Sequence, residues 1–170
     1  MASKAEAEAA QLLERYHRHF SDPEIPVPVE AIAVDLLGLS VDEHESLDAS
    51  GMLIPAEYQI WLNGTESRRS PGRRRFTLAH ELGHWICQYL AGREEPTFCR
   101  AADVGIGAGT RLEREANVFA AALLMPEQLV QREAAELKLN VHALAARFGV
   151  SSPAMKVRLE TLALLPAYMR

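Results

Sequence analysis

Two histidines lie four residues apart in this chain, and a glutamate directly follows the first, at His80, Glu81 and His84. On an α-helix, residues four apart differ by about 40° in direction and about 6 Å in height, so both imidazoles can reach one ion. The H-E-x-x-H pattern on a helix is typical of zinc hydrolases in which the glutamate acts as general base. The spacing therefore predicts metal-assisted hydrolysis.

A catalytic zinc ion needs a third protein ligand, because three protein ligands leave the fourth position open for water. The candidates lie in EREANVFAAALLMP, which contains Glu113 and Glu115. On a helix, Glu113 shares a face with Asn117 and with several alanines, whereas Glu115 points nearly opposite. We choose Glu113 as the third ligand, and we expect Asn117 to accept the second ring N–H of a ligating histidine.

The first of the two helices is predicted from about Phe76 to Ala91. Helical spacing puts an apolar stripe opposite the histidines and leaves Glu81 on the flank, where it is aimed at water rather than at the ion. Gly83 costs about 1 kcal/mol relative to alanine inside a helix, which indicates close packing or substrate access beside the site. The stripe consists of Leu78, Leu82, Trp85, Ile86 and Tyr89.

The two cysteines, Cys87 and Cys99, are interpreted as free thiols of a reducing compartment, with a disulfide as the open alternative. Cys87 shares the histidine face, but a small buried cysteine explains it better than a metal ligand does. The remaining histidines are expected to face solvent or to be structural, the alternative being that one of them stabilises the transition state. They are His17, His19, His44 and His142.

The two segments RRRFTLAHELGHWI and EREANVFAAALLMP together resemble the ImmA/IrrE family of zinc metallopeptidases. The family pattern is an FTxAHExxH helix followed by an ExxANxFAxxLLMP helix, and the likeness extends from about Pro26 onward. It implies that Zn²⁺ is held by His80, His84 and Glu113 and that Glu81 is the catalytic base. It also implies an α+β fold, with a compact zincin-like metallopeptidase core and a C-terminal helical segment like a helix-turn-helix.

Members of this family typically act inside bacteria and cut a transcriptional repressor at one place in response to stress or to signals from mobile elements. The resemblance thus implies a cytoplasmic zinc metalloprotease in transcription regulation, whose protein substrate is a helix-turn-helix repressor. The alternative is a DNA-binding transcriptional regulator that uses a metallopeptidase scaffold without turnover. The intact Glu81 favours the enzyme, because a pure scaffold has no need of a general base.

Charge and composition narrow the classes of partner. The chain has 170 residues, 48% of them hydrophobic, and a formal charge of −5. It is therefore neither a disordered chain of extreme charge nor a generally basic nucleic-acid binder. Five arginines between Arg68 and Arg75 precede the expected helix, where its dipole disfavours them. We prefer pairing with the acidic first third of the chain over phosphate contact. No apolar stretch reaches the length of a membrane span.

The motifs divide the chain into a metallopeptidase core, residues 1–125, and a helical segment, residues 126–170, packed on that core. Within the second part, Val141–Phe148 and Pro153–Leu162 have the layout of a helix-turn-helix. Its second helix offers only Lys156 and Arg158 to a DNA groove, so we expect packing or substrate docking instead of direct DNA binding. The length leaves no room for a sensory domain, and we expect activation by another molecule or by exposure of the substrate.

The core is expected to contain a small sheet and the helices that position the site. An amphipathic helix is predicted over residues 1–20 and a shorter one over Val29–Leu37. The polar stretch ESRRSPGRRR is predicted to be a loop, residues 92–110 an irregular glycine-rich segment, and Arg111–Met125 the second long helix. Three short runs favour strands, namely Leu39–Val41, Met52–Ile54 and Tyr58–Leu62.

Overall fold

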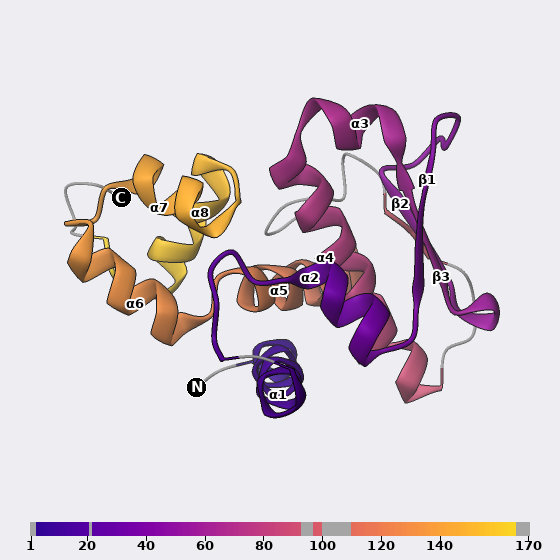
Figure 1. Cartoon of the computed structure of the whole chain (residues 1–170), viewed down its shortest axis with the longest axis horizontal. Coiled ribbons are helices and arrows are strands. Elements are labelled where there is room, and N and C mark those ends of the chain that lie inside the picture. Colours follow the sequence, from indigo (N-terminus) through magenta and orange to yellow (C-terminus); the bar gives the residue numbers. More distant parts are fainter. Residues whose placement is uncertain (1–2, 21, 93–96, 100–109, 166–170) are drawn as a thin grey trace.

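The computed structural model describes residues 3–20, 22–92, 97–99 and 110–165 (Figure 1). Within these ranges, helices surround a central pair and a small sheet lies at one end, which confirms the predicted α+β class. The helices are α1 (Lys4–His19), α2 (Val29–Ala31), α3 (Gly64–Arg69), α4 (Pro71–Cys87), α5 (Arg111–Leu124), α6 (Glu127–Glu136), α7 (Val141–Phe148) and α8 (Ser152–Thr161). The strands are β1 (Ser40–His44), β2 (Gly51–Ile54), β3 (Gln59–Asn63) and β4 (Thr97–Cys99).

The four strands form one sheet in the order β1-β3-β2-β4. β1 runs parallel to β3, and β2 is antiparallel to both β3 and β4. Alternate residues point to opposite faces of a strand, so Ile60 and Leu62 are buried on the side of the core together with Leu53 of β2. The three predicted strands are confirmed with small shifts in their ends, whereas β4 lies in the segment that we predicted to be irregular.

The arginine-rich stretch is helical, so the predicted loop at this place was wrong. Asn63 begins α3 by accepting a hydrogen bond from the backbone N–H of Glu66 at 3.0 Å. Ser70 caps α4 in the same way through the N–H of Arg73, and Pro71 takes the first helical position, where its missing N–H costs nothing. These two caps allow helices to begin at residues of low helix propensity. As a result, α4 begins at Pro71, five residues before the predicted start at Phe76.

The arginines of this stretch pair with the acidic first third of the chain, as predicted. Arg74 contacts Glu30 at 2.7 Å and Glu43 at 2.6 Å, and Arg68 pairs with Glu45. The Arg74 pairs fasten the start of α4 to α2 and to β1, whereas the Arg68 pair fastens α3 to the residue that follows β1. They also offset the unfavourable placement of arginines in the first turn of a helix.

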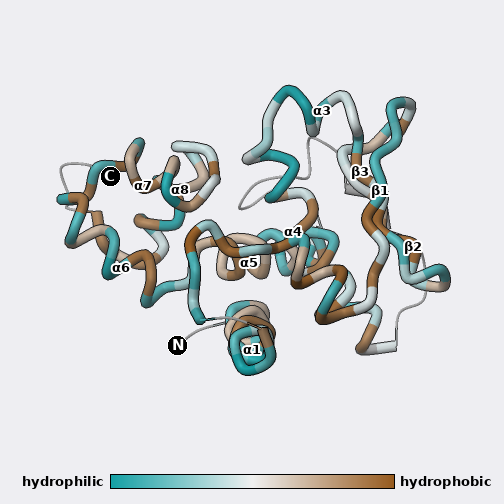
Figure 2. Tube along the Cα trace, in the orientation of Figure 1, coloured by the Kyte–Doolittle hydropathy of each residue, from teal (hydrophilic) through white to brown (hydrophobic). Residues whose placement is uncertain are grey.

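The central helices α4 and α5 lie in close contact, and α1 packs across α5 (Figure 1). The apolar stripe predicted for α4 is buried at Leu78, Leu82 and Trp85. Figure 2 shows α1 end-on, with its hydrophilic residues on the side away from α5. The core therefore forms between α1, the pair α4 and α5, and the inner face of the sheet, and it continues into α6, α7 and α8.

The C-terminal helices are joined to this core by a buried arginine. Arg158 of α8 is 4% exposed, and its guanidinium donates to the carbonyl of Met125 at 3.0 Å and to Glu6 of α1 at 3.0 Å. One of the two cations that α8 offered to a DNA groove is thus turned inward, and the other, Lys156, lies 3.8 Å from Glu160. None of the helices in the described ranges has the length and apolar character that crossing a bilayer demands.

Candidate metal centre

His80, His84 and Glu113 meet at the contact between α4 and α5. The Nε2 atom of His80 lies 3.0 Å from one carboxylate oxygen of Glu113, and the Nε2 atom of His84 lies 3.4 Å from the other. The two Nε2 atoms are 2.9 Å apart. Both histidines are fully buried, and one ligand atom from each of the three residues lies within 4.8 Å of the other two. The structure thus brings together the three residues that we predicted as metal ligands.

Each histidine is held on its far side by an amide. The Nδ1 atom of His80 lies 3.0 Å from Oδ1 of Asn117, and the Nδ1 atom of His84 lies 2.9 Å from Oε1 of Gln88. An imidazole that donates its Nδ1–H leaves Nε2 as the nitrogen that can bind a metal ion, and both Nε2 atoms face Glu113. The contact between His80 and Asn117 is the one that we predicted, whereas the sequence motifs did not reveal Gln88.

This donor set fits a zinc ion. Two imidazole lone pairs and a carboxylate facing one another require a positive charge between them. In a tetrahedral zinc site with bonds of about 2.0–2.1 Å, neighbouring ligand atoms stand about 3.3 Å apart. The observed distances are comparable with that spacing or somewhat shorter: 2.9 Å between the two Nε2 atoms, and 3.0 and 3.4 Å from these atoms to the two carboxylate oxygens.

The charges of the three residues are coupled. Burial by itself raises the pKa of the Glu113 carboxyl, but hydrogen bonds and charge attraction from His80 and His84 outweigh burial and lower it to about 2. Burial lowers the pKa of His84, yet the hydrogen bond with Glu113 and the negative charge of Glu81 raise it overall. Glu113 is therefore ionised at neutral pH, which is the state that binds a cation.

Glu81 is buried rather than placed on an open flank. Its side chain packs against β2, because a Cβ added to Gly51 would lie 2.9 Å from Oε1 of Glu81 and 2.6 Å from the methyl group of Thr77. Its charge acts on His84, which places it beside the donor set. Glycine at position 51 thus leaves room for the carboxylate.

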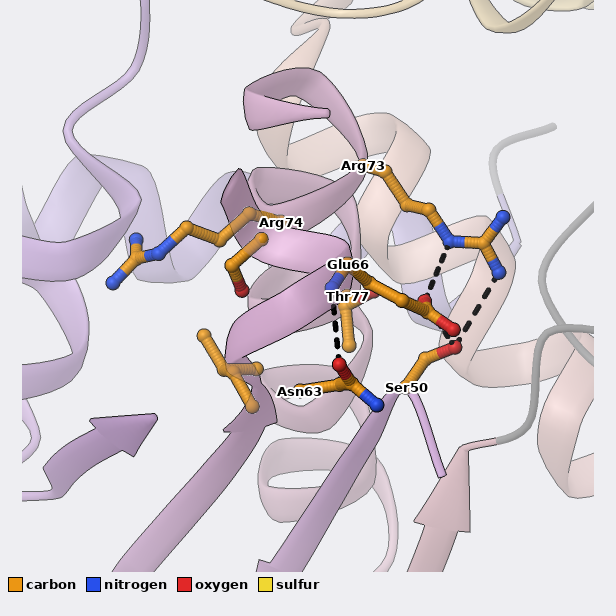
Figure 3. Close-up of a pocket in the computed structure, with 8 residues that line it drawn as sticks. Ser50, Asn63, Glu66, Arg73, Arg74 and Thr77 are labelled. Carbon is orange, nitrogen blue, oxygen red and sulfur yellow. Dashed lines mark hydrogen bonds and ion pairs between the residues drawn. The ribbon is translucent and has the colours of Figure 1, made fainter. Parts of the chain in front are cut away.

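A polar cluster holds the residue that precedes this glycine. The Ser50 hydroxyl donates to Glu66 at 2.8 Å, and Arg73 contacts the same carboxylate at 3.0 Å and the Ser50 hydroxyl at 3.3 Å. Figure 3 shows Arg73 turned toward Ser50 and Glu66, and Arg74 turned to the other side of α4. The cluster ties α3 and α4 to the start of β2, so it fixes the backbone next to Glu81.

Residues 37–160 match the model of the IrrE N-terminal-like domain, peptidase family M78, which covers well over half of the chain. The chain belongs to this family. No curated protein gives a significant match to the IrrE-like sequence. A transcriptional regulator of Mycobacterium tuberculosis is similar in fold, with a TM-score of 0.65 and 20% sequence identity over 91% of this chain and 46% of that one. This chain therefore spans less than half of that regulator, and at this identity the likeness concerns the fold alone.

The other residues considered as ligands lie apart from the IrrE-like donor set. Burial raises the pKa of the Cys87 thiol to about 12, with smaller contributions from Glu115 and Glu8, so Cys87 is a protonated free thiol. The side chain of Cys99 lies outside the described part of the chain. Within the described ranges, the group of side chains that could hold a metal ion includes none of the other histidines, and His44 instead contacts Trp61, with ring centroids 4.1 Å apart and ring planes tilted by 37°.

Proposed function

We propose that this chain is a zinc-dependent endopeptidase in which His80, His84 and Glu113 bind Zn²⁺ and Glu81 is the general base. The observation that carries the proposal is the buried donor set, in which two Nε2 lone pairs and an ionised carboxylate converge from two packed helices. Membership of a metallopeptidase family supports the same activity. A set of two histidines and one carboxylate suits zinc, although Mn²⁺ and Fe²⁺ accept similar donors.

A zinc ion in this site supplies Lewis acidity, which polarises the scissile carbonyl and lowers the pKa of water toward neutrality. Glu81 takes the proton from the attacking water and then delivers it to the leaving amine. Glu81 is buried against Gly51, which limits the positions that its carboxylate can take. The carboxylate is therefore held in one orientation for both proton transfers. Asn117 holds His80 in the tautomer that leaves Nε2 free for the metal.

The substrate that we propose is a helix-turn-helix transcriptional repressor, cut at one site in the cytoplasm as part of a stress response. The resemblance of the two motif helices to repressor-cleaving metallopeptidases supports this choice. The similar fold of a transcriptional regulator is compatible with a role in transcription. The burial of Arg158 and the pairing of Arg68 and Arg74 with acidic residues favour a protein partner over direct binding of DNA.

The test combines metal analysis with cleavage in cells. The chain would be co-expressed with a helix-turn-helix repressor encoded next to its gene, as wild type, Glu81→Gln, Glu113→Gln and the control Glu115→Gln, which changes a glutamate of α5 outside the donor set. We expect one zinc-dependent fragment with wild type and with the control. Glu81→Gln should retain zinc without cleavage, and Glu113→Gln should lose both. Undiminished cleavage by Glu81→Gln would exclude Glu81 as the base.

The second candidate is a DNA-binding regulator without turnover, with which the similar fold of the mycobacterial transcriptional regulator is equally compatible. It predicts salt-dependent retention of the purified chain on DNA, because cations that neutralise phosphates release counterions. Retention that is unchanged in Glu81→Gln, together with the absence of any cleavage fragment, would favour this candidate over the endopeptidase.

A further inference from the structure

Gln88 lies at the end of α4, one helical turn after His84. It is the residue at which the helix ends, and its backbone N–H still donates to the carbonyl of His84 at 3.1 Å. Its side chain is 4% exposed, although glutamine is mostly found at protein surfaces. A buried amide costs free energy unless it is hydrogen-bonded, so its partners explain why it is there.

The amide of Gln88 has one partner on each of the two helices that carry the donor set. Its Oε1 accepts the Nδ1–H of His84 at 2.9 Å. Its Nε2 donates to the backbone carbonyl of Leu112 at 3.1 Å. Leu112 directly precedes Glu113 in the first turn of α5. One side chain therefore contacts the ring of one donor and the backbone next to another.

The backbone carbonyl of Leu112 fixes the orientation of the Gln88 side-chain amide. A carbonyl oxygen only accepts hydrogen bonds, so it must face the NH₂ group of Gln88 and not its oxygen. The oxygen is then left facing His84, and a ring nitrogen beside an acceptor must carry the proton. The backbone of α5 thereby fixes a proton on Nδ1 of His84, which leaves Nε2, 3.4 Å from Glu113, as the ring nitrogen that can bind the metal ion.

Gln88 and Asn117 form a reciprocal pair. Asn117 reaches from α5 to the histidine His80 on α4, whereas Gln88 reaches from the end of α4 to the backbone of α5. Both groups are amides, so neither adds charge to the donor set. Asn117 belongs to the motif of the second helix, but Gln88 lies outside both motifs and is identified only by its contacts.

We propose that Gln88 is a positioning residue that sets the tautomer of His84 and the place of Glu113 together. This role rests on the proposed zinc site. Outer partners of metal ligands change metal affinity by about 10- to 100-fold when they are removed. Loss of both Gln88 bonds affects two of the three ligands, so we expect an effect within that range.

The experiment compares zinc affinity in wild type, Gln88→Met and Gln88→Asn, with Gln131→Met as control. Methionine matches glutamine in length but has no amide, and asparagine keeps the amide on a stem too short to reach both partners. Gln131 is an exposed glutamine of α6, bonded at 3.0 Å to Glu127. Affinity would be measured by competition with a zinc chelator, and exchange of the His84 Nδ1 proton would be followed by NMR on the zinc-loaded chain.

We expect both Gln88 variants to bind zinc about 10- to 100-fold more weakly than wild type, with faster exchange of the His84 Nδ1 proton, and the control to match wild type. Gln88→Asn alone decides the matter if Gln88→Met does not fold. Variants that bind as tightly as wild type, with only a lower melting temperature, would overturn the positioning role while leaving the zinc site intact. A wild-type chain that binds no zinc would overturn the proposed function and this role together.

Discussion

Replacing Gly83 by alanine tests whether the donor set depends on the close approach of α4 and α5. A Cβ at position 83 would lie 2.9 Å from the Cα of Ala116 and 3.0 Å from its carbonyl oxygen. Both are backbone atoms, so no side-chain rotation can relieve the clash, and the two helices must move apart. The ligands His80 and Glu113 lie on opposite sides of this same contact.

Two opposing effects determine how much Gly83→Ala changes the free energy of unfolding. Alanine gains about 1 kcal/mol of helix propensity over glycine, whereas overpacking costs about 1–3 kcal/mol. Because the obstruction is backbone, we expect the upper half of that cost and a net loss of about 1–2 kcal/mol in the free energy of unfolding. For a chain of this size, the loss corresponds to a melting temperature lower by about 2–8 °C. Zinc affinity should fall by about tenfold, because the ligand spacing widens.

Gly72→Ala is the matched control, since it makes the same substitution in the same helix. A Cβ at position 72 would meet its nearest atoms at 3.5 Å, which is ordinary contact. We expect it to leave zinc affinity unchanged and to stabilise the chain by up to about 1 kcal/mol. Melting curves with and without zinc, and chelator competition, measure both quantities. The reasoning fails if Gly83→Ala and Gly72→Ala have the same melting temperature and the same zinc affinity.

Three further outcomes follow from the contacts described above. Gly51→Ala should reduce cleavage while zinc affinity stays near that of wild type, because the added Cβ would lie 2.9 Å from Oε1 of Glu81; a parallel loss of zinc would contradict this. The thiol of Cys87, whose pKa is raised to about 12, should react with iodoacetamide at pH 8 far more slowly in the native than in the unfolded chain. Contacts with Ser3 and Arg158 lower the pKa of Glu6 below 4.5 although burial raises it, so its stabilising contribution is present above pH 4.5 and is lost as the pH falls below it. Glu6→Gln should accordingly flatten the fall of the melting temperature in acid, and an unchanged slope would exclude this linkage.

The residues of the donor set could be predicted from the sequence because helical periodicity fixes the face on which each of them lies, although their meeting depends on the contact of α4 with α5. Four-residue spacing places His80 and His84 on one face and Asn117 one turn after Glu113, whatever the rest of the chain does. The apolar stripe of α4 follows from the same spacing. For Gly83 the sequence left close packing and substrate access open, and the structure shows close packing against the backbone of Ala116.

The elements that were missed depend on contacts between distant parts of the chain. The arginine-rich stretch has the composition of a loop, and it is helical because Asn63 and Ser70 cap it and because Glu30, Glu43 and Glu45 neutralise its charges. β4 is only three residues long and exists by pairing with β2. The cluster of Ser50, Glu66 and Arg73 joins three separate elements and has no local pattern.

The three metal donors and the proposed general base, Glu81, are held by different contacts of α4. The metal donors depend on the contact of α4 with α5, which Gly83, Asn117 and Gln88 control. Glu81 instead depends on the contact of α4 with β2, where Gly51 leaves room for its carboxylate. Metal binding and proton transfer should therefore be separable by mutation, since each is held by a different face of α4.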